Sequence, residues 1–337
     1  MIGVAKTAAA VMCLVASLAG QTPHRQAVSL VPKLSLGHPA QIGTLAIVPI
    51  ESTLPLAQDQ YLTLAQAMKL GVVEIIEVPG QEQVNSLEVR NRSKLPILLF
   101  AGELLLGGKQ DRIVAKDSIV PGNERRDVPV FCVEHGRWTG TPTFSSGNTF
   151  VNDSVRQVAL STGNQSAVWS NVASTNGMVM ASPSTGTIRG TLNDPKVKAA
   201  SDKLYSQISS SFKPTAKTVG VICWINGKIL SADVFANPAL FGGSREKLFR
   251  SYTVDVQLVQ QPKSVPVDLK KCTAFLAAIV SARRNVAEQS AYGATYRVQG
   301  AKVTGYESGR AGFGGGLGGP PAAGAGGGGF GHGTYKP

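Results

Sequence analysis

The chain has 337 residues and a formal net charge of +12; 43% of its residues are hydrophobic and only 16% are charged. The charged fraction is below the roughly 25% usual for soluble domains, which excludes a charge-rich disordered polymer and a coiled coil. At about 100–200 residues per domain, the length allows one large or two modest domains with ample chain for a core. The positive charge is spread without a basic block, so we expect no specific nucleic-acid partner.

Residues 1–19 have the pattern of a secretory signal peptide. Lys6 gives a positive start, residues 7–18 form an apolar stretch too short to span a bilayer, and Ser17 and Ala19 place small residues before a cleavage point. The alternative is an uncleaved N-terminal anchor helix. No later apolar run reaches about 18 residues. We therefore expect an exported protein, periplasmic, cell-envelope or extracellular, with no transmembrane segment in its mature chain.

The first half of the body, which we place at residues 25–308, is predicted to be rich in strands. Hydrophobic alternation and short apolar runs predict strands over residues 42–50, 72–78, 84–89, 95–100, 118–120 and 128–134. A helix is expected over residues 57–70, where Gly71 gives a stop signal. Residues 151–192 are rich in Ser, Thr, Asn and Gly, which is typical of irregular structure.

The second half of the body predicts helices around a hairpin. The expected helices span residues 194–212, 244–260 and 267–290, and the last short strands span 294–298 and 303–306. Asn226-Gly227 between two apolar runs is a strong hairpin signal. Because long βαβ alternation and a GxGxxG turn are absent, we expect a single α+β domain with antiparallel hairpins and several packed helices.

Residues 309–337 form a Gly-rich tail. Nearly half of these residues are Gly, and Leu317 is the one aliphatic core residue among them. Such a segment has too little apolar surface to offset its ordering entropy, so we expect it to be disordered.

Removal of the signal peptide leaves three cysteines, Cys132, Cys223 and Cys272. An odd number permits at most one disulfide within a chain. Cys132 and Cys223 lie in apolar runs and no CxxC pair occurs, so we expect buried, inert thiols rather than a redox or zinc site. The sequence does not decide whether any two of them are bridged.

The first candidate site residue is Glu103, the one charged residue in an apolar run over residues 95–108. Burial of an unpaired carboxylate costs several kcal/mol, so we expect a paired or neutralised group. Gly107-Gly108 allows a tight turn. This turn is expected to bring Lys109, Gln110 and Arg112 back beside Glu103.

The second candidate cluster, Glu134 to Trp138, directly follows the strand expected over residues 128–134. Arg137 has the fork geometry that fits a carboxylate or a phosphate. Trp138 offers a ring for stacking, although a core position is more usual for such a residue, and His135 is expected on the surface. Glu103 and Glu134 are therefore candidate catalytic bases or ligands of a divalent metal.

We expect three cations, Lys109, Arg112 and Arg137, to neutralise a phosphate, with Gln110 and Trp138 as further ligand-binding residues.

The spacing of the residues excludes other kinds of active site. Residues 103–110 do not match a phosphate loop, and no HExxH or GxSxG occurs. The alternative for every charged residue here is a structural ion pair.

These segments resemble the ARPP-type domain, named for its association with ADP-ribosylglycohydrolases and rhodanese/phosphatase-superfamily proteins. The resemblance covers about residues 40–306 and rests on five segments: Gly102-Glu103, Gly107 to Arg112, Cys132 to Trp138, Gln165 to Trp169 and Asn226-Gly227. It implies a predicted enzyme or ligand-binding domain linked to ADP-ribose or nucleotide metabolism, with no established reaction. The signal peptide departs from that context, because ADP-ribose turnover is less expected outside the cytosol.

Two functions remain open at this point. One is an exported domain that binds, and in an enzymatic form processes, an anionic nucleotide- or sugar-phosphate-type ligand. The other is a non-catalytic cell-envelope interaction module in which the same charges are structural ion pairs. Convergence of Glu103, Glu134, Lys109 and Arg137 in one open pocket favours the first, and dispersed or occluded pairs favour the second. The sequence decides neither catalysis nor the oligomeric state.

Overall fold

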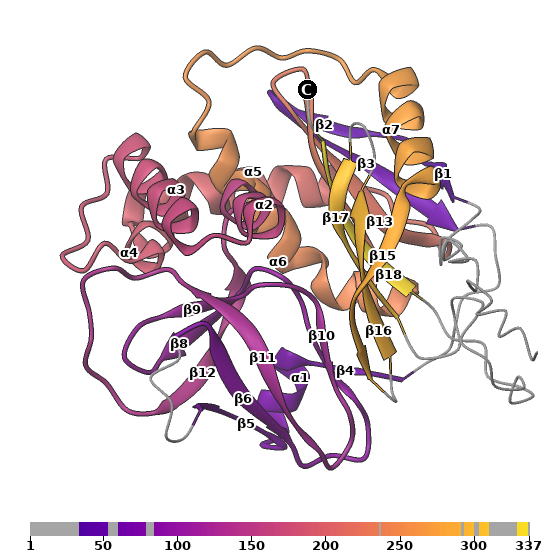
Figure 1. The fold of residues 1–337 in the computed structure, drawn as a ribbon. Coiled ribbons are helices and arrows are strands. Elements are labelled where there is room, and N and C mark those ends of the chain that lie inside the picture. The colour runs from indigo at the N-terminus through magenta and orange to yellow at the C-terminus, as the bar shows by residue number, and fades with distance from the viewer. Residues whose placement is uncertain are drawn as a thin grey trace, which may run out of the picture.

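A six-stranded barrel forms one end of the molecule (Figure 1). The computed structural model describes residues 34–52, 60–78, 84–235, 237–290, 293–299, 303–309 and 329–335. The barrel strands, in closed order, are β11 (Arg125–Cys132), β6 (Ser86–Asn91), β5 (Val73–Glu77), β12 (Thr143–Phe150), β8 (Glu103–Gly107) and β9 (Arg112–Val114). Alternate residues such as Val128 and Val130 fill its interior, as period-two patterning requires.

A helix and a small sheet extend the barrel core. The helix is α1 (Leu64–Lys69), and the sheet contains β10 (Ser118–Val120), β7 (Ile97–Leu99) and β4 (Leu62–Thr63). Thr63 and Gln66 form a reciprocal capping box that starts α1. The helix expected over residues 57–70 is thus confirmed only from residue 64, and residues 53–59 lie outside the described residues.

A long antiparallel sheet forms the other end of the molecule. Its strands, in spatial order, are β1 (Leu34–Leu36), β3 (Leu45–Ser52), β13 (Thr218–Ile225), β14 (Lys228–Val234), β18 (Gly329–Tyr335), β17 (Val303–Gly309), β16 (Gly293–Gln299) and β15 (Arg283–Ser290), and β2 (Ala40–Ile42) pairs with β3. The β13–β14 hairpin is confirmed, because Asn226 and Gly227 turn with φ of 52° and 84°.

Helices cover both faces of this sheet around β3 and β13. Leu45 and Ile47 of β3 face α5 (Pro195–Ser211) and α6 (Pro238–Gln257), whereas Ala46 and Val48 face α7 (Leu269–Ser281). Every residue of β13 is buried because the sheet is covered on both sides here. The helix expected over residues 267–290 was wrong beyond Ser281: the chain pairs with β16 as β15 instead.

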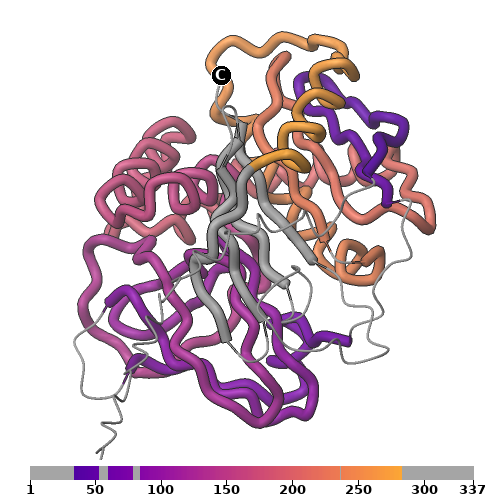
Figure 2. The backbone as a smooth tube through the Cα atoms, turned by 45° about the vertical axis from the view of Figure 1, so that its right-hand side comes forward, coloured from indigo at the N-terminus to yellow at the C-terminus, as the bar shows by residue number. Residues whose placement is uncertain are grey.

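Three helices lie together above the barrel, and α2 among them also contacts β14 of the sheet (Figures 1 and 2). They are α2 (Asp153–Thr162), α3 (Gln165–Met178) and α4 (Ile188–Asn193). The expectation of irregular structure over residues 151–192 was wrong, because propensity is a weak prior that packing overrides. Apolar residues of these helices pack on the outer barrel wall, and caps start them: Asn164 accepts from Ala167 N, and Thr187 accepts from Arg189 N.

The α+β class is confirmed by these helices and antiparallel strands. Cys132, Cys223 and Cys272 are buried and unbridged. The apolar runs around Cys132 and Cys223 predicted their burial, whereas the sequence left the bridging undecided. Among the described residues, none of the helices has both the length and the hydropathy needed to cross a membrane.

The Gly-rich tail is described only in part. Residues 329–335 form β18, which pairs with β14 and β17, so for these residues the structure has a strand where composition predicted disorder. Residues 310–328 and 336–337, like the expected signal peptide at residues 1–19, lie outside the described residues.

Candidate functional site

The turn from β8 to β9 begins the candidate site. Gly107 and Gly108 have φ of 133° and 55°, conformations that favour glycine. A Cβ on Gly108 would lie 2.1 Å from the Phe144 ring, and one on Gly107 would lie 2.4 Å from the Thr143 carbonyl oxygen. The Gly-Gly pair therefore lets the turn lie flat against β12. The predicted tight turn is confirmed.

Arg137 holds this turn from the neighbouring segment. Its Nη1 donates to the carbonyl oxygens of Gly108 at 2.7 Å and Thr139 at 3.0 Å. Its Nε donates to Glu134 Oε2 at 2.9 Å, and its Nη2 lies 3.1 Å from Asp111 Oδ1. Since the guanidinium already meets two carboxylates and the carbonyls of Gly107, Gly108 and Thr139, its main role in this structure is to fix two loops.

Glu134 and Asp111 form the acidic side of the same cluster, and both are buried. Glu134 Oε2 accepts from Asp111 N at 3.0 Å, and Oε1 accepts from the Thr185 hydroxyl at 2.7 Å. Burial alone would raise the pKa of Glu134, but the hydrogen bonds from Arg137, Asp111 N and Thr185 outweigh it and lower that pKa. Burial raises the pKa of Asp111, although the Gly107 N–H and Arg189 oppose this. Glu134 is therefore held as a carboxylate.

The other residues nominated for ligand binding are placed differently. Gln110 is buried, and its Nε2 donates to the His135 carbonyl oxygen at 3.4 Å. Arg112 is buried in β9, where its Nη1 donates to Gln110 O at 2.8 Å; burial lowers its pKa. Lys109 is exposed, and its backbone N donates to Glu77 Oε1 at 2.8 Å. Trp138 is 54% exposed and caps no core.

Glu103 does not join this cluster. By strand register it lies level with Val114 and Val130, whereas Glu134 follows the far end of β11, about 10 Å or more away at 3.3 Å per residue. Its cation is Lys247 of α6, at 2.6 Å between Nζ and Oε1. The expectation that Lys109 or Arg112 pairs with Glu103 was wrong, because the turn returns those residues toward Glu134.

A second buried cluster, which sequence reasoning missed, lies between α2, β14 and α6. Arg156 Nη2 contacts Asp233 Oδ1 at 2.5 Å, and its Nη1 contacts Asp153 Oδ1 at 3.1 Å. Tyr252 donates to Asp233 Oδ2 at 2.5 Å. Asp255 accepts from the backbone N of Asp153 at 2.6 Å, so it caps α2. The sequence did contain two signals for this cluster. Asp153 and Arg156 are three residues apart, and so are Tyr252 and Asp255, a spacing that places both side chains of each pair on one helix face.

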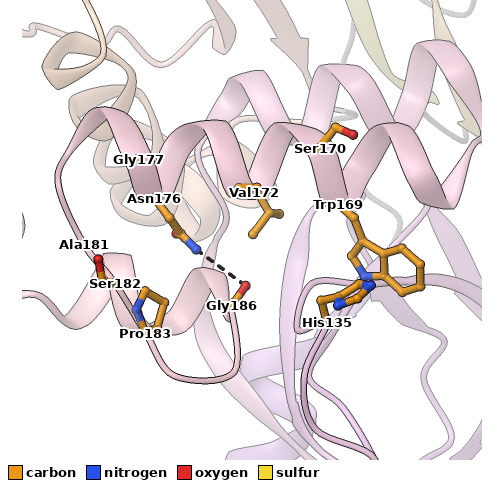
Figure 3. Close-up of a pocket in the computed structure, with 11 residues that line it drawn as sticks. His135, Trp169, Ser170, Val172, Asn176, Gly177, Ala181, Ser182, Pro183 and Gly186 are labelled. Atoms are coloured by element: carbon orange, nitrogen blue, oxygen red, sulfur yellow. Dashed lines mark hydrogen bonds between the residues drawn. The ribbon is translucent and has the colours of Figure 1, made fainter.

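Arg137, Glu134, Asp111 and the Gly107-Gly108 turn form what we call the Arg137 cluster. A pocket of about 550 Å³ adjoins it, and we call this the His135 pocket (Figure 3). It is lined by His135, Trp169, Ser170, Val172, Ala173, Asn176, Gly177, Ala181, Ser182, Pro183 and Gly186. The rings of His135 and Trp169 meet edge to face, 4.6 Å between centroids. His135 was expected to be merely a surface residue, and it is exposed, but it also forms one wall of this pocket.

Two separated segments meet at this wall. The side chain of Gln165 brackets Cys132: its Oε1 accepts from Cys132 N at 2.8 Å, and its Nε2 donates to Cys132 O at 2.8 Å. This pair holds the start of α3 beside the end of β11 and thereby sets Trp169 against His135. The part of the chain that the structure describes contains no group of three His, Cys, Asp or Glu residues placed to hold a metal.

The sequence model of the ARG and Rhodanese-Phosphatase-superfamily-associated Protein domain, ARPP-1, matches residues 33–312. The chain belongs to this family. The suspected resemblance is thus confirmed over most of the chain. No curated protein and no solved structure matches it significantly.

The motifs that carried the resemblance have definite positions in this ARPP-1 domain. Residues 107–112 and 132–138 form the Arg137 cluster. In the segment 165–169, Gln165 brackets Cys132 and Trp169 lines the His135 pocket. Glu103 lies apart with Lys247. Three of the five segments therefore build one corner of the barrel and the pocket beside it, whereas Gly102-Glu103 and the Asn226-Gly227 turn of the sheet lie elsewhere.

Proposed function

We propose that this protein is an exported small-molecule-binding domain whose binding site is the His135 pocket. The observation that carries the proposal is the position of this pocket. It is walled by His135, the residue after Glu134, and Glu134 is fixed by Arg137, Thr185 and Asp111 N. A wall held this firmly is preorganised, which lowers the entropic cost of binding.

The chemistry of the lining favours a planar ring with polar edges. His135 and Trp169 supply aromatic surface, and Ser170 and Ser182 supply polar groups around it, whereas the Asn176 amide already bonds Gly186 O and the Thr191 hydroxyl. Trp169 Nε1 is a buried donor with no hydrogen-bond partner among the described residues, which a ring nitrogen or carbonyl oxygen would satisfy. These features suit the base and sugar of a nucleoside or nucleotide, the ligand class that the family resemblance implies.

The phosphate part of the expected ligand has less support. The lining of the His135 pocket contains no Lys or Arg. Arg112 and Arg137 are engaged with acceptors of the chain itself. Any phosphate would therefore project from the pocket mouth toward solvent. The lining also contains no Asp or Glu, so we propose binding rather than catalysis by Glu103 and Glu134.

Thermal unfolding with adenosine, AMP, ADP-ribose and ribose 5-phosphate tests this proposal. We expect the three base-containing compounds to raise Tm by about 2 °C or more at saturation, and ribose 5-phosphate to have no effect. Ala173→Trp places an indole in the His135 pocket and should abolish the shift. Ser174→Trp, one residue further along α3, is the matched control and should retain it.

The result that would overturn the proposal is the absence of any shift, or a shift that survives Ala173→Trp. Absence would favour the second candidate, a non-catalytic cell-envelope interaction module. The internal pairing of Glu103, Glu134, Arg112 and Arg137 is the observation that favours this candidate.

Export is a separate part of the proposal, with its own test. N-terminal sequencing of the native protein should begin at Gly20, because Ser17 and Ala19 precede the expected cleavage point. A native protein that retains Met1 would contradict export.

A further inference from the structure

A second pocket, which the proposed function does not use, lies on the other side of α3. We call it the Asp255 pocket; its volume is about 380 Å³, and it lies between α3, the tip of the β13–β14 hairpin and the end of α6. At 3.6 residues per turn, two sets of α3 residues face opposite ways. Trp169, Val172, Ala173 and Asn176 line the His135 pocket, whereas Asn171, Ser174, Thr175 and Met178 line the Asp255 pocket.

The charged residues in this lining are Asp255 and Lys228. Asp255 accepts hydrogen bonds from Asp153 N at 2.6 Å, Ser154 N at 3.2 Å and Asn152 Nδ2 at 3.2 Å. No basic side chain of the described residues forms an ion pair with it. Its negative charge is therefore stabilised by the amides of Asn152, Asp153 and Ser154 and by the Ser154 side chain, and burial raises its pKa. A cationic group in the pocket would complement it.

The remaining lining adds a buried acceptor and an apolar surface. Asn171 Oδ1 is buried and has no hydrogen-bond partner within the described part of the chain, so it can accept from a ligand beside Asp255. Ile229 and Leu258 supply apolar walls. Lys228 is exposed, and the described residues offer it no ion-pair partner.

We infer that the Asp255 pocket binds a small amphipathic zwitterion of the α-amino-acid class with an aliphatic side chain. Its ammonium group would meet Asp255 and Asn171, its carboxylate would meet Lys228, and its side chain would lie on Ile229 and Leu258. This arrangement satisfies the opposite charges and the apolar wall with one ligand, whereas a purely apolar ligand would leave Asn171 Oδ1 without a partner.

Calorimetric titration of the full chain with three matched probes tests this inference. The probes are L-leucine, isoamylamine, which lacks the carboxylate, and 4-methylpentanoate, which lacks the amine. We expect L-leucine to bind best, isoamylamine to bind more weakly and 4-methylpentanoate not to bind. Lys228→Gln should weaken L-leucine about tenfold while leaving isoamylamine unchanged, because it removes only the carboxylate partner.

The pair of α3 variants separates this site from the His135 pocket. Ser174→Trp should abolish L-leucine binding, and Ala173→Trp should leave it intact. Ser174 is exposed, so its replacement is compatible with folding, whereas Asp255→Asn would also weaken the cap of α2. No binding of L-leucine or isoamylamine, equal binding of 4-methylpentanoate, or binding that persists in Ser174→Trp would overturn the inference and leave Asp255 as a helix cap only.

Discussion

Arg137 joins more parts of the barrel end than any other side chain of its segment. It bonds the β8–β9 turn through Gly107 and Gly108, and it pairs with Glu134 and Asp111. Its removal would leave two buried carboxylates without this cation. A side chain with these contacts stabilises the fold, and it affects the neighbouring His135 pocket only through that stability.

Arg137→Ala is therefore expected to lower the free energy of unfolding by about 3–5 kcal/mol, the usual cost of breaking a buried pair. Arg137→Lys should recover only part of this loss, because an ammonium group lacks the planar fork. Urea denaturation measures both. Arg92→Ala is the control: this arginine pairs with Glu74 but is 66% exposed, so its loss should cost no more than about 1 kcal/mol. A fully stable Arg137→Ala variant that loses only ligand binding would contradict this role.

The ion pair of Glu103 offers a second test at a single residue. Glu103→Gln leaves Lys247 buried above the Phe150 ring, 5.3 Å from its centroid, without its carboxylate. We expect a loss of about 3–5 kcal/mol. Lys247→Met should be similarly costly alone, and the double variant should be less destabilised than the two losses added together, as measured in a double-mutant cycle. Simple additivity would show that the two side chains do not interact.

The sequence predicted the burial of Glu103 but not its cation, whereas for Glu134 it predicted the nearby cation Arg137. Burial followed from the apolar run around Glu103, and Arg137 was found because it lies three residues from Glu134. Lys247 is separated from Glu103 by 144 residues, so no local spacing links them. The same limit applies to Trp169, whose contact with His135 depends on how α3 docks on β11.

Elements with strong local signals were predicted well. The strand over residues 118–120 and the Asn226-Gly227 hairpin have the expected positions, because alternation and turn chemistry act within a few residues. The helices α2 and α3 were missed because the Ser and Thr residues of both, and the Asn residues of α3, carry weak helix propensity. The cap of α2 comes from Asp255, which lies about a hundred residues further along the chain. A reading of the sequence around α2 therefore does not reveal it.

The β8–β9 turn gives a prediction at the element scale. Gly108→Ala must both adopt φ near 55° and displace the buried Phe144 ring, whose Cζ lies 2.1 Å from the new Cβ. Gly163→Ala has nearly the same φ, 60°, but meets nothing within 4 Å. We expect Gly108→Ala to be less stable than Gly163→Ala by about 1–3 kcal/mol, the cost of overpacking. Equal stabilities by thermal or urea unfolding would contradict the close packing of this turn.

At the scale of the whole molecule, buried charge connects the barrel and the sheet. Arg156 of α2 pairs with Asp233 of β14, and its guanidinium lies 5.1 Å from the centroid of the Phe150 ring of β12. A Cβ on Gly102, at the start of β8, would lie 2.2 Å from Arg156 Cγ. The two halves therefore meet at a polar junction, and their association should depend on the protonation of that junction.

Asp153 makes this dependence measurable. Burial, opposed by Arg156 and reinforced by Asp233 and Asp255, raises the pKa of Asp153 from 3.8 to about 7. Between these values the folded protein binds a proton that the unfolded chain does not, so stability should fall as pH rises from about 4 to 7. This group contributes at most about 4 kcal/mol to that fall. The raised pKa values of Asp111 and Asp255 act in the same direction, whereas the lowered pKa of Glu134 acts only below pH 4.5.

Asp153→Asn should flatten the fall in stability between pH 5 and 7, because the amide does not titrate and its oxygen can still accept from Arg156. Urea denaturation at several pH values measures the slope for the native protein and the variant. Asp202→Asn is the control: its pKa is lowered by Lys198 and Arg250 at the surface, so it should leave the slope in this window unchanged. A variant at Asp153 with the native slope would show that Asp153 stays ionised and that Arg156 compensates all the charge at the junction.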